Sequence, residues 1–296
     1  MAAYYTFEDF SGTAALSNSD NPYDGLIETC NDDPSKIQAV YEKHRTNRNA
    51  QQKAKLLAPD FPGVVIDEML ANLETGGEDW RHCLVFWARP PARIRELIAE
   101  VQRQLLLAAP SMWIMPPSNL HMTALEVTHS RTEQEIFSLV EQLSSAAHDI
   151  ADYTIDHRAR LIKPVISFDA QALALSFSPA SGEDEARYSY HHLRRDVFNK
   201  VQAAGVKVES RYVVPSAHLT VGRFITKRDF EVDGAVDHDK VAKLVETIES
   251  INAWLEGEIW SSPQGEWRVG EEKGLDHRQG KLWYGGGETV YLGKGY

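Results

Sequence analysis

The sequence has few cysteines, no long apolar run and no basic leader, and each absence removes a class of protein. Cys30 and Cys83 are the only two cysteines in 296 residues, too few for a disulfide framework. Cysteines and histidines also lack the spacing of a zinc site. The longest apolar run beside a strand pattern, residues 83–88, is too short to span a bilayer. No basic segment followed by an apolar one opens the chain, so we expect an intracellular protein, cytoplasmic or nuclear, that does not bind membranes.

Positive charge is also scarce, and the deficit is local. The chain holds 31 Lys and Arg against 43 Asp and Glu, a formal charge of −12. Residues 1–80 contain 14 of the acids and 6 of the bases, whereas residues 81–296 contain 29 and 25. This balance disfavours a protein that coats long nucleic acids by neutralising their phosphates. A short or terminal phosphoester remains compatible with it.

The acidic N-terminal part differs from the rest in its pattern as well. Residues 1–33 are rich in Ser, Asn, Asp and Gly, which predicts irregular structure. A helix is expected over residues 34–57, because Asp33 can cap it and proline suits its first position. A turn at residues 60–63 and a short helix with an apolar face over residues 65–73 follow. We therefore predict an acidic, partly helical extension, residues 1–80, packed on a main domain, residues 81–296.

Strand and helix patterns alternate through the main domain. They predict an α+β fold in which helices flank antiparallel sheets. No Gly-rich phosphate loop occurs, so neither a Rossmann nor a P-loop fold is indicated. His191 and His192 lie in a charged helical segment and are expected to face solvent. The expected strands are 83–87, 120–127, 161–168, 172–177, 217–225, 267–269, 281–284 and 288–292, and the expected helices lie around 94–105, 136–143, 183–204 and 241–255.

One local pattern, His-x-Thr within an apolar strand, occurs twice. His121 and Thr123 form the first copy, and His218 and Thr220 form the second. Residues two apart on a strand project from the same face, so each histidine points the same way as its threonine. If the two strands adjoin, two imidazoles and two hydroxyls converge on one cleft.

Such a set of side chains suits the chemistry of a phosphoester. A neutral imidazole can take a proton from an attacking water, and a protonated one can give a proton to the leaving oxygen. Threonine hydroxyls can donate hydrogen bonds to the non-bridging phosphate oxygens and hold the phosphorus in place. This chemistry needs no metal ion and no other cofactor.

The two motifs resemble those of the two-histidine (2H) phosphoesterase superfamily, which has His-x-Thr/Ser motifs on facing strands of a duplicated α+β fold. The lead-in Trp113-Ile-Met-Pro-Pro-Ser-Asn119 before His121 is similar to the branch of RNA 2′,3′-cyclic phosphodiesterases, also called RNA 2′-5′ ligases. Arg223, three residues after Thr220, matches that branch as well. The resemblance implies a two-lobed fold with a central cleft over residues 81–296.

The resemblance also implies roles for five residues. His121 and His218 would be catalytic, and Thr123, Thr220 and Arg223 would bind substrate. The implied reaction is metal-independent hydrolysis of a nucleotide or an RNA-terminal phosphodiester, above all a 2′,3′-cyclic phosphate.

Several alternatives stay open on the sequence alone. The histidines and threonines could be ordinary strand residues, and Arg223 a plain surface charge where its strand ends. A superfamily enzyme could act instead on 2′-5′ oligoadenylate, ADP-ribose cyclic phosphate or a 3′-terminal oligonucleotide. The protein could also be a non-catalytic module that binds RNA or nucleotides. A metallohydrolase has the least support, because His-x-Glu-x-x-His and clustered carboxylates are absent.

Overall fold

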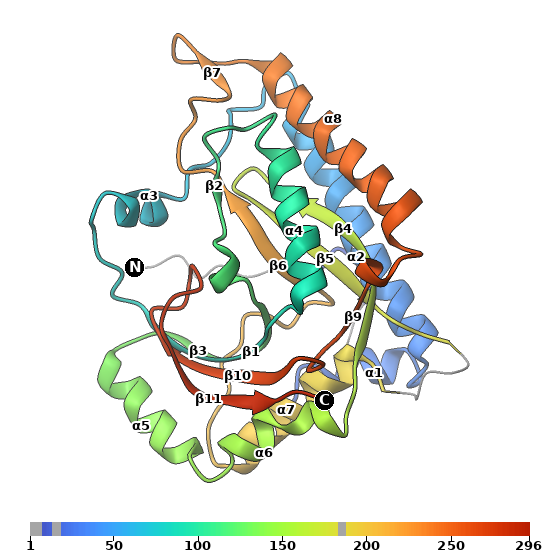
Figure 1. Ribbon diagram of the computed structural model, residues 1–296, viewed down its shortest axis with the longest axis vertical. Helices are drawn as coiled ribbons and strands as arrows, with labels where there is room; N and C mark the ends of the chain where they lie inside the picture. Colours follow the sequence, from blue (N-terminus) through green and yellow to red (C-terminus); the bar gives the residue numbers. More distant parts are fainter. Residues whose placement is uncertain (1–7, 14–18, 183–187) are drawn as a thin grey trace.

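The computed structural model describes residues 8–13, 19–182 and 188–296, and it contains two larger antiparallel sheets. Each sheet is covered by its own set of helices (Figure 1). We name the sheets after the strand that carries a His-x-Thr motif in each, the β3 sheet and the β6 sheet. This arrangement confirms the predicted α+β class with antiparallel sheets flanked by helices.

The β6 sheet has five strands in the order β2-β6-β5-β4-β9. Its strands are β2 (Trp113–Ile114), β4 (Arg160–Phe168), β5 (Ala172–Pro179), β6 (Ala217–Arg223) and β9 (Glu266–Arg268). Three helices pack on this side of the molecule: α2 (Pro34–Leu56), α4 (Ala92–Leu105) and α8 (His238–Trp254). The β4–β5 hairpin and the helix beginning at Pro34 were both predicted, and the Asp33 side chain accepts a hydrogen bond from the Ser35 N–H as a cap.

The β3 sheet has four strands in the order β11-β10-β1-β3. Its strands are β1 (His82–Ala88), β3 (Met122–Arg131), β10 (Lys273–Gly280) and β11 (Glu288–Lys294). Its helices are α5 (Glu133–Leu143), α6 (Ala147–Ala151) and α7 (Tyr190–Ala203). Smaller elements are α1 (Asp24–Thr29), α3 (Glu68–Glu74), the hairpin β7 (Glu231–Val232) and β8 (Ala235–Val236), 3₁₀ turns at 117–119, 153–155 and 263–265, and a π turn at 255–259.

Three predictions of secondary structure were wrong. A short helix, α1, lies in the stretch expected to be irregular. Residues 281–284 form a turn rather than a strand, and the strand of this region is β10, which precedes them. β10 is rich in polar residues and has no strong strand pattern, but it pairs on both sides, with β1 and β11. This pairing outweighs its weak intrinsic propensity. Helix α7 begins at Tyr190, later than predicted, and residues 183–187 lie outside the described part of the chain.

The expectation that His191 and His192 face solvent was also wrong. Their exposed fractions are 1% and 3%. The Tyr41 hydroxyl lies 2.9 Å from His191 Nδ1, and His192 Nε2 lies 2.7 Å from the Asp32 carboxylate. Residues of the N-terminal extension therefore cover α7, and they supply the polar partners that a buried imidazole needs.

One hydrophobic cluster includes residues of the extension and of both sheets. Tyr23, Ile37, Tyr41 and Leu56 are each at most 1% exposed within it. The boundary at residue 80 stays a prediction, but the core does not stop there. None of the described helices is both long and apolar enough to cross a membrane.

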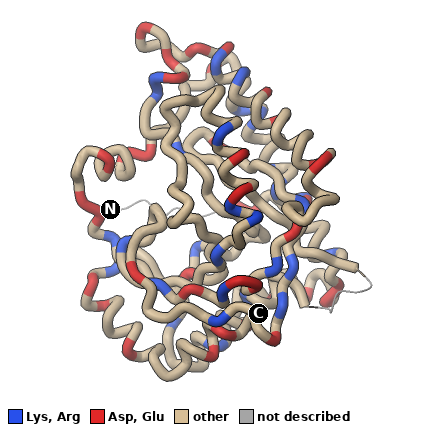
Figure 2. The backbone as a smooth tube through the Cα atoms, viewed as in Figure 1, with Lys and Arg blue, Asp and Glu red and all other residues tan. Residues whose placement is uncertain are grey.

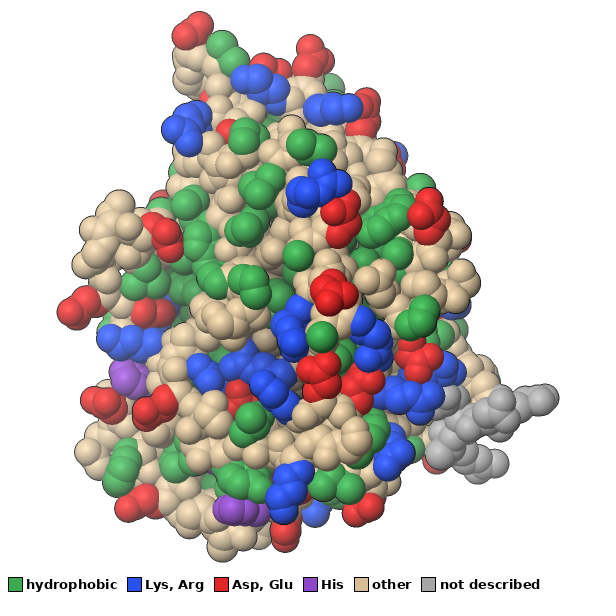
Figure 3. Space-filling model, viewed as in Figure 1, with side chains coloured by type: hydrophobic (Ala, Val, Ile, Leu, Met, Phe, Trp, Pro, Cys, Tyr) green, Lys and Arg blue, Asp and Glu red, His purple; other side chains and the backbone are tan. Residues whose placement is uncertain are grey.

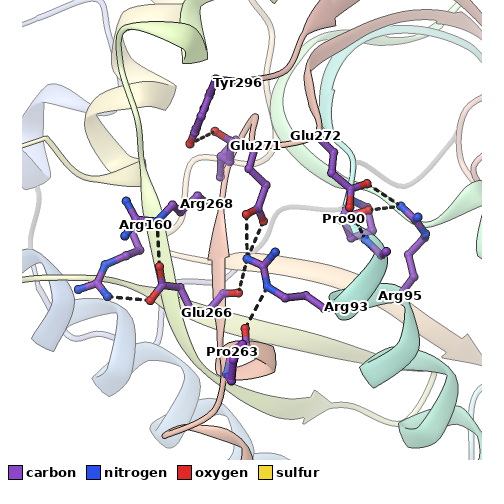
Figure 4. Close-up of polar contacts among 12 residues, drawn as sticks. Pro90, Arg93, Arg95, Arg160, Pro263, Glu266, Arg268, Glu271, Glu272 and Tyr296 are labelled. Carbon is purple, nitrogen blue, oxygen red and sulfur yellow. Dashed lines mark hydrogen bonds and ion pairs between the residues drawn. The ribbon is translucent and has the colours of Figure 1, made fainter.

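A charged cluster crosses from one sheet to the other where β9 leads into β10 (Figure 4). Arg93 of α4 donates to the Glu271 carboxylate at 2.7 Å and to the Glu266 backbone carbonyl at 3.0 Å. Arg160 of β4 donates to the Glu266 carboxylate at 2.9 Å. Helix α4 is thereby tied to the segment that connects the two sheets.

Candidate active site

The two His-x-Thr motifs lie at the start of β3 and on β6, the strands at which the two sheets approach each other. On β6, His218 and Thr220 are partly exposed, whereas the residues between and beside them are buried. His121, just before β3, and Thr123 show the same alternation around the buried Met122. The period of two therefore turns both motifs away from the core.

The structure brings the four motif side chains to one cleft. His121, Thr123, His218 and Thr220 line it together with Arg194, Tyr212, Val214 and Ser216. Its volume is about 410 Å³, including the part open to solvent. The two motifs, 97 residues apart in the sequence, thus face the same space from opposite sheets.

The backbone before the first motif fixes the tautomer of His121. Its Nδ1 lies 2.7 Å from the Asn119 carbonyl oxygen, which can only accept, so Nδ1 carries the proton. In the neutral ring, Nε2 is then left with its lone pair free to accept. The Asn119 side chain donates in turn to the Tyr284 carbonyl at 3.0 Å. His121 is therefore oriented by the loop that follows β10.

A stacked aromatic ring also holds His121. The ring centroids of Trp87 and His121 are 3.8 Å apart and the planes are inclined by only 19°. Trp87 is 1% exposed and lies on β1, the strand that pairs with β3. The Trp87 ring therefore blocks movement of the His121 imidazole toward β1.

His218 has a different partner, a side chain rather than the backbone. Its Nδ1 lies 2.9 Å from the Ser216 hydroxyl, which also lines the cleft. The Tyr212 ring lies beside it, with a centroid distance of 6.1 Å. Because a hydroxyl can donate or accept, this contact leaves the His218 tautomer open.

Both motif histidines are held in the neutral form. Burial lowers the pKa of His121 to about 3, and nearby guanidinium groups, Arg89 first among them, act in the same direction. Burial likewise lowers the pKa of His218 to about 3, helped by Arg48 and Arg194. The cleft without a ligand therefore has two neutral imidazoles at pH 7, in a positive electrostatic surrounding.

Arg194 of α7 lines the cleft, although the His-x-Thr sequence pattern did not indicate it. It is 1% exposed, donates to the Val214 carbonyl at 2.9 Å and to the Tyr23 hydroxyl at 3.2 Å, and lies over the Tyr23 ring. No carboxylate among the described residues forms an ion pair with it. A signal did exist, because helical spacing places Arg194 on one face with the buried Val197 and Phe198. A buried guanidinium with only neutral partners suits a site for an anion.

Arg223 lies at the end of β6, and it is not among the residues that line the cleft. Its guanidinium lies 3.1 Å from the Asp67 carboxylate, which also accepts a hydrogen bond from the Tyr284 hydroxyl. Its charge still helps to lower the pKa of His121. The substrate contact expected of Arg223 therefore stays a prediction.

Within the described part of the chain, no three His, Cys, Asp or Glu side chains are grouped so that they could hold a metal ion.

No protein-family model matches the sequence, and no curated protein matches it. Several solved structures are similar to part of the chain. A conserved protein of unknown function, ATU0111 from Agrobacterium tumefaciens strain C58, shares 9% identity over 73% of this chain and 88% of its own, with a TM-score of 0.49. TT0787 of Thermus thermophilus shares 16% identity over 71% of this chain and 96% of its own, with a TM-score of 0.41.

Usb1 of Kluyveromyces marxianus shares 10% identity over 72% of this chain and 96% of its own, with a TM-score of 0.37. A structure of Usb1 with uridine monophosphate matches with a TM-score of 0.33. At TM-scores below 0.5, these similarities identify neither a family nor an activity for this chain.

Proposed function

We propose that the protein is a metal-independent phosphodiesterase of the 2H type that opens a 2′,3′-cyclic phosphate on a nucleotide or an RNA end. One observation carries the proposal: two His-Thr pairs, from strands far apart in the sequence, line a single cleft. Among the described residues, no carboxylate forms an ion pair with either imidazole, so both are available for proton transfer.

The proposed reaction needs two proton transfers and one displacement at phosphorus. One imidazole accepts a proton from water as the water oxygen bonds to phosphorus. The bond from phosphorus to one ribose oxygen breaks, and the other imidazole, protonated, gives its proton to that oxygen. The product is a phosphomonoester with a free neighbouring hydroxyl. His121 and His218 share these two roles, and neither assignment is preferred.

Charge stabilisation falls to the remaining cleft residues. The hydroxyls of Thr123 and Thr220 donate to the non-bridging oxygens, where negative charge gathers during the displacement. The buried guanidinium of Arg194 offsets the charge of the phosphate group. An anion bound here also raises the pKa of the imidazoles, so that one can hold the proton that the leaving oxygen requires.

The test is hydrolysis of nucleoside 2′,3′-cyclic monophosphates and of short RNAs that end in a cyclic phosphate. We expect His121→Ala and His218→Ala each to lower kcat by at least a hundredfold, since a general acid or base contributes about 10² to 10⁴. His238→Ala, at an exposed position on α8, is the matched control and should leave the rate unchanged.

The reaction should also survive a chelator. Loss of activity with EDTA and its recovery with zinc or manganese would contradict the mechanism. Parallel assays with 2′-5′ oligoadenylate, ADP-ribose cyclic phosphate and 3′-terminal oligonucleotides separate the alternative substrates. Thermal stabilisation by these compounds without any product would instead identify a binding module.

A further inference from the structure

A second and larger hollow, which we call the basic groove, lies beside the cleft. Its volume is about 850 Å³, including the part open to solvent. Of the residues that the structure describes, four cations and a single acid line it: Arg89, Arg95, Lys273, Arg278 and Asp276. Figure 3 shows a band of Lys and Arg side chains, interrupted by acidic ones, across the middle of the face turned to the viewer. Figure 2, in the same view, shows acidic positions spread over the rest of the backbone.

The acids around the groove do not balance its cations. Asp276 lies 2.8 Å from the Arg89 guanidinium and 3.7 Å from that of Arg278. Arg95 reaches Glu272 at 3.5 Å. Among the described residues, none forms an ion pair with Lys273. The charge of Glu288 also acts on Arg278. The four cations thus face three acids, and an excess of one positive charge remains in a chain whose net charge is −12.

The groove and the cleft share a wall. Ser118 and Leu120 line the groove, and the next residue, His121, lines the cleft. The Arg89 guanidinium donates to the Leu120 carbonyl at 3.1 Å and lies over the ring of Trp87, the ring that stacks on His121. The two hollows are therefore adjacent, and an RNA whose terminal phosphoester enters the cleft would place its next phosphates near the groove.

We propose that the basic groove binds the sugar-phosphate backbone of an oligoribonucleotide whose end lies in the cleft. This inference rests on the proposed function and makes the substrate an RNA chain rather than a mononucleotide. Guanidinium groups bind phosphates through paired hydrogen bonds, which suits them to a backbone. No aromatic side chain of the described chain lines the groove, so these residues offer no surface on which bases stack. Recognition in the groove is thus independent of base sequence.

The test compares substrates of different length with a variant that loses two groove cations. Arg95→Gln combined with Lys273→Gln removes charge from the groove and leaves every cleft residue in place. We expect KM for an eight-nucleotide RNA ending in a cyclic phosphate to rise at least fivefold. We expect KM for a nucleoside 2′,3′-cyclic monophosphate to stay unchanged.

Binding of an eight-nucleotide RNA with a 3′-phosphate, followed by fluorescence anisotropy at several salt concentrations, gives a readout that does not require turnover. Each cation that contacts a phosphate adds about 0.7 to the slope of log affinity against log salt for single strands, so the variant should show a slope lower by about 1.4.

Arg103→Gln with Lys243→Gln is the matched control, since both side chains are exposed and lie outside the groove. Equal affinity and equal salt slope in the groove variant and the wild type would overturn the groove proposal. Wild-type binding no tighter for the eight-mer than for a mononucleotide would overturn it too. Failure of the wild type to cleave any substrate, with groove-dependent binding intact, would count against the proposed function alone.

Discussion

At the scale of single residues, the protonation state of the two motif histidines decides what the cleft can do. Without a ligand both imidazoles are neutral at pH 7, because the pKa of each is lowered to about 3. General acid catalysis needs one of them protonated. One imidazole must therefore take up a proton from solvent when the anion binds, because the charge of the anion raises the pKa of the imidazole that it contacts.

Binding of sulfate should accordingly take up a proton. Sulfate stays a dianion from about pH 5 to about pH 8, so any proton taken up is bound by the protein. The complex holds more protons than the free protein from about pH 3 up to the raised pKa, so affinity should weaken as pH rises across this window and should level off above the raised pKa. Calorimetry in two buffers with different ionisation enthalpies measures the uptake. Binding without uptake by the wild type, or equal uptake by the double variant His121→Gln, His218→Gln, would contradict this assignment.

Arg194 is the second residue whose role can be tested singly. Arg194→Gln removes the buried charge, and we expect kcat/KM to fall at least tenfold, about 1.4 kcal/mol, with Arg194→Lys recovering part of the loss. The guanidinium helps to lower the pKa of His218, so Arg194→Gln should also raise that pKa, as followed by NMR. A fall in thermal stability with no change in the His218 pKa would indicate a structural role only.

The sequence could predict that each motif histidine lies on the same face as its threonine, but not which residues surround the pair. Strand alternation is a local pattern, and it places His218 and Thr220 on one face without any knowledge of the fold. The position of Arg194 depends on Tyr23, which is 171 residues away in the chain. Such a contact arises only when the extension packs on α7, and no local period records it.

At the scale of elements, the turn between β10 and β11 positions His121 of the first motif through Asn119. Gly285 has a φ of +81°, and an added Cβ would lie 2.5 Å from the Asn119 Cβ and 2.6 Å from the Asn119 carbonyl oxygen. That oxygen accepts the hydrogen bond from His121 Nδ1. Sequence alone predicted a strand over residues 281–284 because Trp283 and Tyr284 favour strands, and three glycines follow them. The close approach to Asn119 and the positive φ explain why this turn needs a glycine at residue 285.

Gly285→Ala should therefore lower activity by disturbing His121 rather than by removing any reacting group. The methyl group displaces Asn119 and strains the backbone at positive φ, which costs about 1 kcal/mol or more. We expect kcat to fall at least tenfold while the protein still folds, as monitored by circular dichroism. Gly234→Ala, also at positive φ but with open space around its Cβ position, is the control for backbone strain alone. Equal loss of activity in both variants would argue against a link through Asn119.

At the scale of the whole molecule, the acidic extension is part of the same core as the two sheets. Five large side chains of the extension are at most 4% exposed, and they belong to the cluster that fills the main domain: Tyr23, Ile37, Tyr41, Leu56 and Phe61. Burial of a large apolar side chain contributes about 1.5 to 3 kcal/mol, so the five together contribute about 8 to 15 kcal/mol. A typical domain has a net stability of about 5 to 15 kcal/mol.

Removal of residues 1–80 should therefore leave a chain that cannot fold alone. The truncated protein would expose the apolar faces of β4 and β5 beneath α2, and it would strip His191 and Arg194 of the tyrosine hydroxyls that they contact. We expect residues 81–296 to aggregate or to lack cooperative thermal unfolding, as measured by gel filtration and circular dichroism. Tyr23→Phe in the full chain removes only the hydroxyl and should keep the fold while weakening sulfate binding through Arg194. A soluble, cooperatively folded 81–296 with full affinity for sulfate would show instead that the extension is dispensable for the cleft.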